Sequence, residues 1–458
     1  MPIATISPLT GETLQEFKEL DHAEIDARIA LARETFLSYR LTSFGDRARW
    51  MREAADLLDA EQDDVGRMMT TEMGKPLAQA RAEVAKCATA MRFYADRAER
   101  FLADEPADAA AVGASHAYAR YQPLGVVLAV MPWNFPLWQV VRFAAPALMA
   151  GNTGLLKHAS NVPQTALYLE DALRRAGFPE GCFLTLLIGS GAVETVLRDR
   201  RVAAATLTGS EPAGQSVAQI AGGEIKKTVL ELGGSDPFIV MPSADLDRAA
   251  EVGVFARVQN NGQSCIAAKR FIVHTDVYDA YAERFAERMR RLVVGDPMDT
   301  ATEVGPLATR QGRDDVTGLV EDAVSQGATV VCGGNSPDRP GWFYQPTVVA
   351  GVTQAMRMFS EEVFGPVAGL YRVSDIAEAI EMANATSFGL GSNAWTNNET
   401  ERQRFIRDLD AGAVFINGMT TSYPQLPFGG VKRSGYGREL SAQGIREFCN
   451  AKTVWIGA

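Results

Sequence analysis

Between residues 125 and 233, short apolar segments alternate with segments whose apolar residues recur at helical spacing. Strands are expected at Gly125–Val130, Gly154–Lys157, Phe183–Ile188, Ala203–Thr208 and Thr228–Leu232. Helices are expected between them, for example at Gln164–Ala176 and Pro212–Ile220. Strands that alternate with helices in this way form a parallel sheet with helices on both faces. The sequence therefore predicts an α/β fold, whose ligands would gather beyond the carboxyl ends of the strands.

The rest of the chain predicts further structural units, in line with about three domains for 458 residues. Residues 21–103 have helical periodicity, and Ser115–Tyr121 alternates like a strand outside the main domain. A second α/β region covers residues 234–440, and Lys452–Ile456 is a candidate terminal strand. Strands in the second region are expected at Phe271–His274, Thr329–Cys332, Pro366–Tyr371 and Ala413–Ile416.

Charge and cysteine content exclude several classes of function. The formal net charge of −11 disfavours binding to nucleic acid and to anionic membranes. No apolar run is long enough to cross a membrane, and the N-terminus lacks the pattern of a signal peptide. The five cysteines are odd in number and form no CxxC pair, which indicates reduced thiols in the cytoplasm. The four histidines show no metal-ligand spacing, so no metal is expected.

Three side chains are candidates for catalysis. Cys265 follows a polar, glycine-containing stretch, and a modest lowering of its ordinary pKa of about 8.5 would make it a nucleophile. Glu231 ends a strand next to two glycines, where a carboxylate can act as a general base. Asn134 stands between two prolines and could stabilise an oxyanion. The alternatives are a buried inert cysteine, a salt-bridged acid at a sheet edge and a turn-capping asparagine.

Two glycine-containing turns follow predicted strands. In Thr206–Gly214, backbone N–H groups and the Ser210 hydroxyl could face a phosphate at a helix start, although the lysine of a P-loop is missing. Gly189–Glu194 almost spells GxGxxG, but Glu194 occupies the position of the third glycine. We interpret the second segment as a structural turn.

Taken together, these segments resemble the aldehyde dehydrogenase superfamily over nearly the whole chain and in the family's order. The segments that carry the resemblance are Pro132–Pro136, Leu230–Gly234, Gly262–Cys265, Glu361–Pro366 and Pro427–Gly435. The resemblance implies a Rossmann-like cofactor domain, a second α/β catalytic domain and a small β element for assembly into a homodimer or homotetramer. The implied boundaries are 1–104 with 124–231, 232–440, and 105–123 with 441–458, respectively.

The resemblance also implies a mechanism and a cofactor site. Cys265 would form a thioester with the aldehyde carbon, Asn134 and the backbone N–H of Cys265 would hold the oxyanion, and Glu231 would activate water. The cofactor contacts that carry over are Trp133, Asn134, Lys157, His158, Ala159, Ser160, Gly209, Ser210, Leu232, Glu362 and Phe364.

The preferred cofactor is argued from charge. Relatives that prefer NAD often place a glutamate at the position of Ser160, where a carboxylate would repel a 2′-phosphate. Ser160 is neutral, and Lys157 supplies positive charge nearby. We therefore expect NADP to be accepted and preferred, with NAD as the second cofactor.

For the substrate, the chain resembles the succinate-semialdehyde dehydrogenase branch, which implies Arg142, Trp138 and Ser422 as substrate contacts. Arginine suits a carboxylate through two parallel hydrogen bonds. The alternative for Arg142 is a structural salt bridge. Gln259 departs from relatives that have a second substrate arginine there, so specificity could be looser. Another semialdehyde or an aliphatic aldehyde, acylation of coenzyme A, and a catalytically silent relative remain alternative functions.

Overall fold

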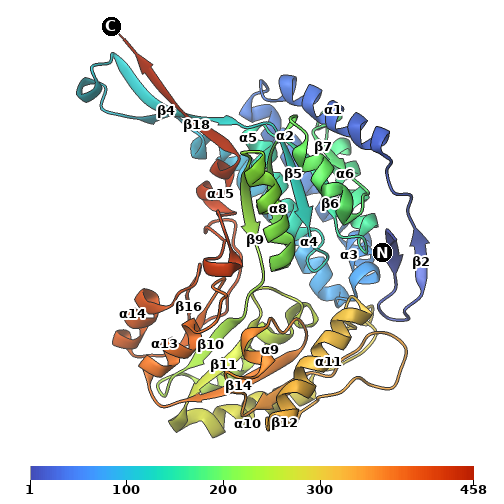
Figure 1. Cartoon of the computed structure of the whole chain (residues 1–458), viewed down its shortest axis with the longest axis vertical. Coiled ribbons are helices and arrows are strands. Elements are labelled where there is room, and N and C mark those ends of the chain that lie inside the picture. Colours follow the sequence, from blue (N-terminus) through green and yellow to red (C-terminus); the bar gives the residue numbers. More distant parts are fainter. Residues whose placement is uncertain (1, 458) are drawn as a thin grey trace.

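The computed structural model describes residues 2–457, which form two helix-covered sheets and a smaller projecting sheet (Figure 1). The first sheet has six strands in the order β17-β9-β8-β5-β6-β7. All of its neighbours pair in parallel except β17, which is antiparallel to β9. These strands are β5 (Val126–Met131), β6 (Thr153–His158), β7 (Phe183–Thr185), β8 (Val202–Thr208), β9 (Lys227–Glu231) and β17 (Gly435–Tyr436). The predicted parallel α/β sheet is thus confirmed.

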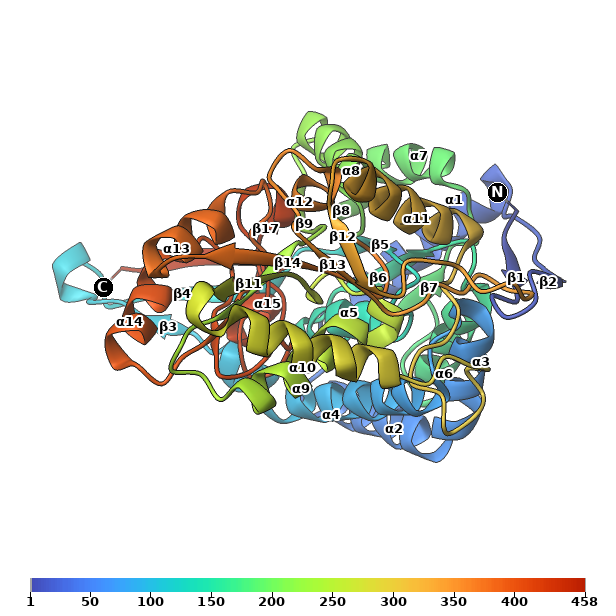
Figure 2. The ribbon, with the colours of Figure 1, turned by 90° about the horizontal axis from the view of Figure 1, so that it is seen from below.

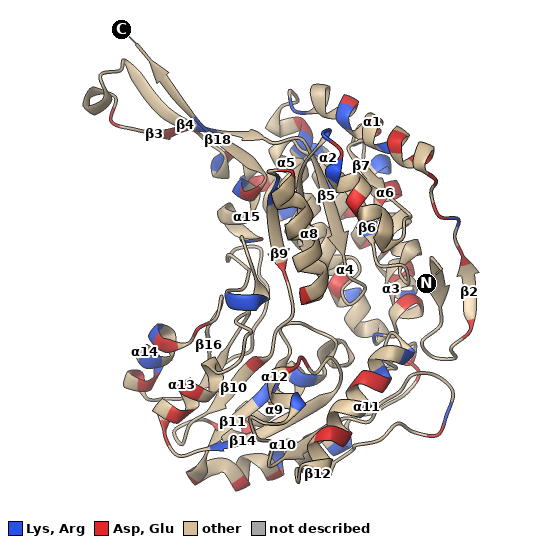
Figure 3. Cartoon of the chain, in the orientation of Figure 1, with Lys and Arg blue, Asp and Glu red and all other residues tan. Residues whose placement is uncertain are grey.

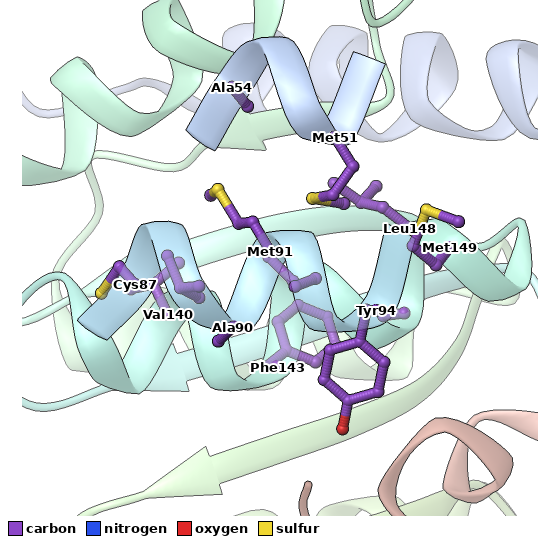
Figure 4. Close-up of a cluster of buried hydrophobic side chains, with 14 of the residues drawn as sticks. Met51, Ala54, Cys87, Ala90, Met91, Tyr94, Val140, Phe143, Leu148 and Met149 are labelled. Carbon is purple, nitrogen blue, oxygen red and sulfur yellow. The ribbon is translucent and has the colours of Figure 1, made fainter. Parts of the chain in front are cut away.

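Helices cover both faces of this sheet. One face packs against α1 (His22–Tyr39), α7 (Val193–Arg198) and α8 (Glu211–Gly223). The opposite face is covered by α2 (Phe44–Ala60), α3 (Gln62–Met73), α4 (Leu77–Phe101), α5 (Trp138–Ala150) and α6 (Pro163–Arg175). In Figure 4, apolar side chains of α2, α4 and α5 meet in the core of that second layer. The predicted helical character of residues 21–103 is confirmed.

Helix α5 is positioned by a buried carboxylate from α4. Glu83 accepts hydrogen bonds from the backbone N–H groups of Leu137 and Trp138, both at 2.9 Å, and therefore caps the start of α5. The same carboxylate forms a buried ion pair with Lys75. These contacts fix the position of α5 relative to α4, and both helices contribute side chains to the site described below.

The second sheet has seven strands in the order β12-β13-β14-β11-β10-β15-β16, and only β12 is antiparallel to its neighbour. Helices α9 and α10 cover one face, and α11 to α14 cover the other (Figure 2). The strands are β10 (Asp236–Val240), β11 (Ala268–His274), β12 (Thr329–Cys332), β13 (Thr347–Ala350), β14 (Val367–Val373), β15 (Asn393–Trp395) and β16 (Phe415–Ile416). The helices are α9 (Leu246–Val258), α10 (Tyr278–Arg291), α11 (Arg310–Ser325), α12 (Arg357–Ser360), α13 (Ile376–Asn384) and α14 (Glu399–Asp408).

The third sheet projects from the body of the molecule, with the C-terminal strand on one side (Figure 1). Strand β18 (Cys449–Ile456) pairs with β4 (His116–Pro123) along its whole length, and β3 (Glu105–Pro106) pairs with the other side of β4. Helix α15 (Ser441–Glu447) leads into β18. Both strands that the sequence predicts outside the main domains are present. The role of this sheet in assembly stays a prediction, as do the domain boundaries.

Some elements differ from the sequence-based expectation. A hairpin of β1 (Ala4–Ile6) and β2 (Thr13–Glu16) was not predicted. The strand expected at Phe183–Ile188 ends at Thr185, because the following residues bond to the sheet only through the N–H of Leu186. Within residues 2–457 no helix is both long and apolar enough to cross a membrane. Both signs of charge occur along outer helices such as α1 and α14 (Figure 3). The mixed surface charge therefore does not indicate a ligand, and the charged residues inside the molecule are the ones considered below.

Candidate active site

Two pockets meet at Cys265. The nucleotide-side pocket has a volume of about 640 Å³, and the aldehyde-side pocket has about 370 Å³, both including space open to solvent. The first is lined by Pro132, Trp133, Asn134, Thr208, Gly209, Ser210, Leu232, Gly233, Cys265, Glu362 and Phe364. The second is lined by Lys86, Phe135, Trp138, Gln139, Arg142, Gln259, Ser264, Cys265, Ile266, Thr420, Thr421, Ser422 and Phe428. A group attached to the Cys265 sulfur can therefore be approached from both pockets.

The loop before Cys265 adopts a rare backbone conformation. Asn260, Asn261 and Gly262 have φ angles of 57°, 58° and 75°, so three consecutive residues are left-handed. Asparagine and glycine tolerate this region better than other residues. A Cβ atom on Gly262 would also lie 2.3 Å from the carbonyl carbon of Gly365. The Asn-Asn-Gly sequence is therefore what allows the chain to present Cys265 at this point.

Two buried cations fix the backbone of the Cys265 loop through hydrogen bonds to its carbonyl oxygens. The Lys269 ammonium donates to the carbonyl oxygens of Ser264 at 2.7 Å and of Cys265 at 2.6 Å. Arg257 donates to the carbonyl oxygen of Gly262 at 2.6 Å. The backbone N–H of Cys265 donates to no described residue. That N–H remains available to an oxyanion next to the sulfur.

Burial controls the protonation of Cys265. Burial raises the pKa of the Cys265 thiol to about 12, and the positive charges of Arg142 and Lys269 oppose this rise only in part. The lowering that would favour a thiolate is not found at this site, because desolvation of the thiolate outweighs the nearby cations. The resting side chain is a thiol, which must lose its proton before it attacks a carbonyl carbon.

Asn134 is buried beside the same loop. Its side-chain amide donates to the main-chain carbonyl oxygen of Gln263 at 3.2 Å, and the main-chain carbonyl oxygen of Asn134 accepts from the Asn260 side chain at 2.7 Å. The Asn134 side chain is therefore fixed in orientation, and its second amide hydrogen is free for a ligand in the nucleotide-side pocket that it lines. These hydrogen bonds join the segment that carries Asn134 to the loop before Cys265.

His158 supports the loop that carries Asn134. Its ring nitrogens lie 3.3 Å from the carbonyl oxygen of Met131 and 2.8 Å from that of Pro136. Burial lowers the pKa of His158 to about 4, so the ring is neutral. Its Nδ1 accepts from the backbone N–H of Ala159 at 3.0 Å, and its Nε2–H donates to the carbonyl oxygen of Pro136. The imidazole is occupied inside the protein, so the predicted cofactor contact of His158 stays a prediction for its main chain.

Glu231 ends β9 and is almost fully buried, with 2% of its surface exposed. Neither of its carboxylate oxygens accepts a hydrogen bond from a described residue. Burial raises the pKa of Glu231 well above its ordinary value, and the negative charge of Glu439 raises it further. These shifts favour the protonated acid, and they make the ionised carboxylate a stronger base than one in water.

The nucleotide-side pocket has features that suit a dinucleotide. Gly209 and Ser210 precede α8, and the Ser210 side chain makes no capping bond to the helix. The N–H groups at the start of α8 are therefore available to a phosphate. Gly214 lets α8 pack closely on Leu232, because a Cβ atom there would lie 2.6 Å from a Leu232 methyl carbon.

On the opposite wall, Glu362 accepts from the N–H of Gly234 at 3.1 Å, and the rings of Phe364 and Trp133 meet edge to face at 5.7 Å.

Four predicted cofactor residues lie at or after the end of β6 and do not line either pocket: Lys157, His158, Ala159 and Ser160. Burial lowers the pKa of Lys157, whose side chain is close to fully buried. Ser160 is partly exposed, and its carbonyl oxygen accepts from the N–H of Ala4 at 3.0 Å. Their role in binding a nucleotide remains a prediction.

In the aldehyde-side pocket, the three predicted substrate residues lie together, but Arg142 has a partner within the chain. Arg142 is 2% exposed and forms a buried ion pair with Glu439. Its guanidinium also lies 4.6 Å from the centre of the Phe428 ring. The structural salt bridge that stood as the alternative for Arg142 is therefore present. Trp138 donates from Nε1 to the Ser422 hydroxyl oxygen at 3.0 Å.

Lys86 is a pocket residue that the sequence analysis missed. It comes from α4, and its ammonium donates to the Ser422 hydroxyl oxygen at 2.8 Å. No motif surrounds Lys86 in the sequence, and Ser422 lies 336 residues further along the chain. Only the packing of α4 against α5 brings Lys86 into the pocket.

Comparisons with known proteins agree with one another. The aldehyde dehydrogenase family model matches residues 1–454. An NADP(+) succinate-semialdehyde dehydrogenase from Mycolicibacterium paratuberculosis is 70% identical and covers 100% of this chain and 97% of its own length. A relative of the same name from Mycobacterium tuberculosis is 69% identical over 100% of both chains.

The fold is also shared with solved structures. The crystal structure of a succinic semialdehyde dehydrogenase from Streptococcus pyogenes in complex with NADP+ has a TM-score of 0.96 and 38% identity, and covers 99% of this chain and 100% of that chain. The succinate-semialdehyde dehydrogenase from Burkholderia pseudomallei has a TM-score of 0.97 and 34% identity, and covers 100% and 95%.

Proposed function

This chain belongs to the aldehyde dehydrogenase family, and we propose that it oxidises succinate semialdehyde to succinate with NADP as the hydride acceptor. The observation that carries the proposal is a pocket with two cations, the half-buried Lys86 and the buried Arg142, that opens onto the candidate nucleophile Cys265. An aldehyde that also carries a carboxylate matches this combination of charge and reactivity. The names of the relatives from Mycolicibacterium paratuberculosis and Streptococcus pyogenes support the same substrate and cofactor.

In the first step, the Cys265 sulfur forms a bond to the aldehyde carbon. The thiol releases its proton to water beforehand, and the charges of Arg142 and Lys269 stabilise the thiolate. The carbonyl oxygen becomes an alkoxide, which the Asn134 amide and the backbone N–H of Cys265 would hold. NADP, when bound, supplies the acceptor for the hydride that this carbon then gives up, which leaves the acyl group on Cys265 as a thioester.

In the second step, Glu231 takes a proton from water as the water attacks the thioester carbon. A carboxylate surrounded by protein and free of hydrogen-bond donors is a stronger base than one in water. The carbon–sulfur bond breaks, the carboxylic acid leaves, and the proton held by Glu231 returns to the Cys265 sulfur. We expect hydrolysis rather than transfer to coenzyme A, because a general base such as Glu231 suits attack by water.

The fit to NADP rests on residues of the chain itself. The start of α8 beside Gly209 and Ser210 would hold the pyrophosphate, and Glu362 would hold the nicotinamide ribose. Trp133, Leu232 and Phe364 would form apolar walls of this pocket. Lys157 and the neutral side chain of Ser160 are proposed to accept the 2′-phosphate, with main-chain contacts from His158 and Ala159.

The aldehyde-side pocket would hold the rest of the substrate. Trp138 and Ser422 are proposed to contact the distal carboxylate and the carbon chain, and Arg142 would contribute positive charge. Glu439 already pairs with Arg142, so a substrate carboxylate would also depend on the second cation of this pocket, Lys86.

The proposal is tested by steady-state kinetics on substrates matched in length. Succinate semialdehyde and butanal both have four carbons, and only the former carries a carboxylate. We expect kcat/KM to be at least about 100-fold higher for succinate semialdehyde, because a buried site for a charged group discriminates strongly against its loss. Equal values for the two aldehydes would contradict the proposed substrate, and the absence of NADPH formation with either would contradict the enzymatic activity.

Assembly and location form part of the same proposal. The projecting sheet leaves Val112, Trp455 and Ile456 exposed by 54%, 56% and 45%, which supports burial of this sheet against another copy in a homodimer or homotetramer. The five cysteines are all free thiols, which supports a cytoplasmic location. Light scattering of the intact chain and of a chain truncated after Phe448 tests the assembly.

A further inference from the structure

Resting on the substrate proposed above, we propose that Lys86 is the specificity residue that binds the distal carboxylate of the semialdehyde, ahead of Arg142. Lys86 lies on α4 and lines the same pocket as Cys265. It belongs to none of the motifs around the nucleophile, the general base or the nucleotide turn. The inference comes from three independent features of its surroundings.

The first feature is the balance of charge in the pocket. Arg142 is neutralised by Glu439 in a buried ion pair. Lys86 forms no ion pair with a carboxylate among residues 2–457, because no acidic oxygen there lies within salt-bridge distance of its ammonium. The nearest acid on its own helix, Glu83, is committed to Lys75 and to the N–H groups at the start of α5. Lys86 is therefore the cation of this pocket whose charge is left for a ligand.

The second feature is desolvation. The Lys86 ammonium lies 4.2 Å from the centre of the Trp138 ring, inside the pocket rather than in bulk water. Burial lowers the pKa of Lys86 to about 8, and the charge of Arg142 contributes to this lowering. A partly buried cation with no counter-ion is unfavourable on its own. An anion bound in the pocket would relieve that cost.

The third feature is the orientation of the Ser422 hydroxyl. Its oxygen accepts one hydrogen bond from Lys86 at 2.8 Å and another from Trp138 Nε1 at 3.0 Å. A hydroxyl has two lone pairs and one hydrogen, so both lone pairs are used and the hydrogen must be donated to a further acceptor. The free N–H groups of Lys86 and the O–H of Ser422 are adjacent donors without a described acceptor. A carboxylate supplies two acceptor oxygens for these donors.

The role assigned to Lys86 is selection of the substrate rather than chemistry. Gln259 lines the same pocket and is neutral, so it offers hydrogen bonds without charge. Replacing Lys86 should therefore weaken the binding of an aldehyde that has a carboxylate and leave the reaction of a neutral aldehyde intact. This split separates a specificity residue from a residue that only maintains the fold.

The test compares Lys86→Met with the unaltered enzyme on succinate semialdehyde and butanal. For Lys86→Met, we expect kcat/KM for succinate semialdehyde to fall at least about 30-fold, mainly through KM, because one partner of a buried charge pair is lost. With butanal, kcat/KM should stay within about twofold, since that aldehyde makes no charge contact. Lys86→Arg keeps the charge and should recover much of the preference. Lys18→Met, at an exposed lysine, is the matched control.

Two results would overturn the inference. An equal loss with both aldehydes would show that Lys86 maintains the fold or the chemistry, and an unchanged preference would show that another group binds the carboxylate. If Lys86→Met does not fold, Lys86→Gln carries the same comparison, with far-UV circular dichroism as the criterion of folding. A lack of preference in the unaltered enzyme would instead reject the proposed substrate, so the two failures are distinguishable.

Discussion

The two pockets that meet at Cys265 are built in different ways. The nucleotide-side pocket is lined by short contiguous segments at the ends of strands, with glycines and apolar side chains in most positions. The aldehyde-side pocket draws single residues from separated elements, including Lys86 on α4, Arg142 on α5 and Ser422 in a late loop. A cofactor shared by a whole family can be bound through backbone and local motifs, whereas selection of one aldehyde depends on side chains that only folding brings together.

The largest effect is expected where the two pockets join. Cys265→Ala should lower turnover at least about 10⁴-fold with every aldehyde, because it removes the atom to which the substrate binds covalently. Binding of NADPH, followed by its fluorescence, should be nearly unchanged. Substantial turnover by Cys265→Ala would remove the basis for treating the two pockets as one active site.

A smaller loss is expected from Glu231→Gln, at the end of β9. Steady-state kcat should fall roughly 10²–10⁴-fold, because the loss affects the release of the acyl group. A rapid burst of NADPH should remain in stopped-flow absorbance, since Glu231 acts after the hydride has left. Loss of the burst together with kcat would assign Glu231 to an earlier step.

On the aldehyde side, Arg142→Met should destabilise the fold by about 3–5 kcal/mol, because it leaves the buried Glu439 carboxylate without a counter-ion. Urea unfolding measures this loss. The double substitution Arg142→Met with Glu439→Gln should recover most of it. A single variant as stable as the original chain would mean that the ion pair contributes little, and Arg142 would again be a candidate for the substrate carboxylate.

The smallest expected effect concerns the choice between NADP and NAD. Ser160→Glu should reduce the ratio of kcat/KM for NADP over NAD by about tenfold to 100-fold, because a carboxylate would repel the 2′-phosphate. Ser325→Glu, at an exposed serine that ends α11 over the second sheet, is the matched control. If the original enzyme already prefers NAD by tenfold, the interpretation of Ser160 fails.

The extent of successful prediction follows the same division between local and distant contacts. The parallel order of β5 to β9 and the helices around them were expected from the alternation of patterns, because each element depends on residues close in sequence. The hairpin of residues 4–16 was not expected. All four residues of β2 are exposed, so this strand has no buried face that an alternating pattern of apolar residues would reveal. Most predicted cofactor contacts line one pocket, whereas the His158 ring turns inward to hold the Asn134 loop.

The amino-acid sequence by itself determined the chemistry that is available: a cysteine after an Asn-Asn-Gly turn, a glutamate at a strand end and a glycine turn before a helix. Each of these is a local motif, and local backbone preferences are sufficient to form it. Only the tertiary structure decided that Arg142 pairs with Glu439, that Lys86 enters the substrate pocket and that burial raises the pKa of Cys265. Electrostatic interactions and desolvation depend on distances in space, and those distances arise from chain segments that are hundreds of residues apart.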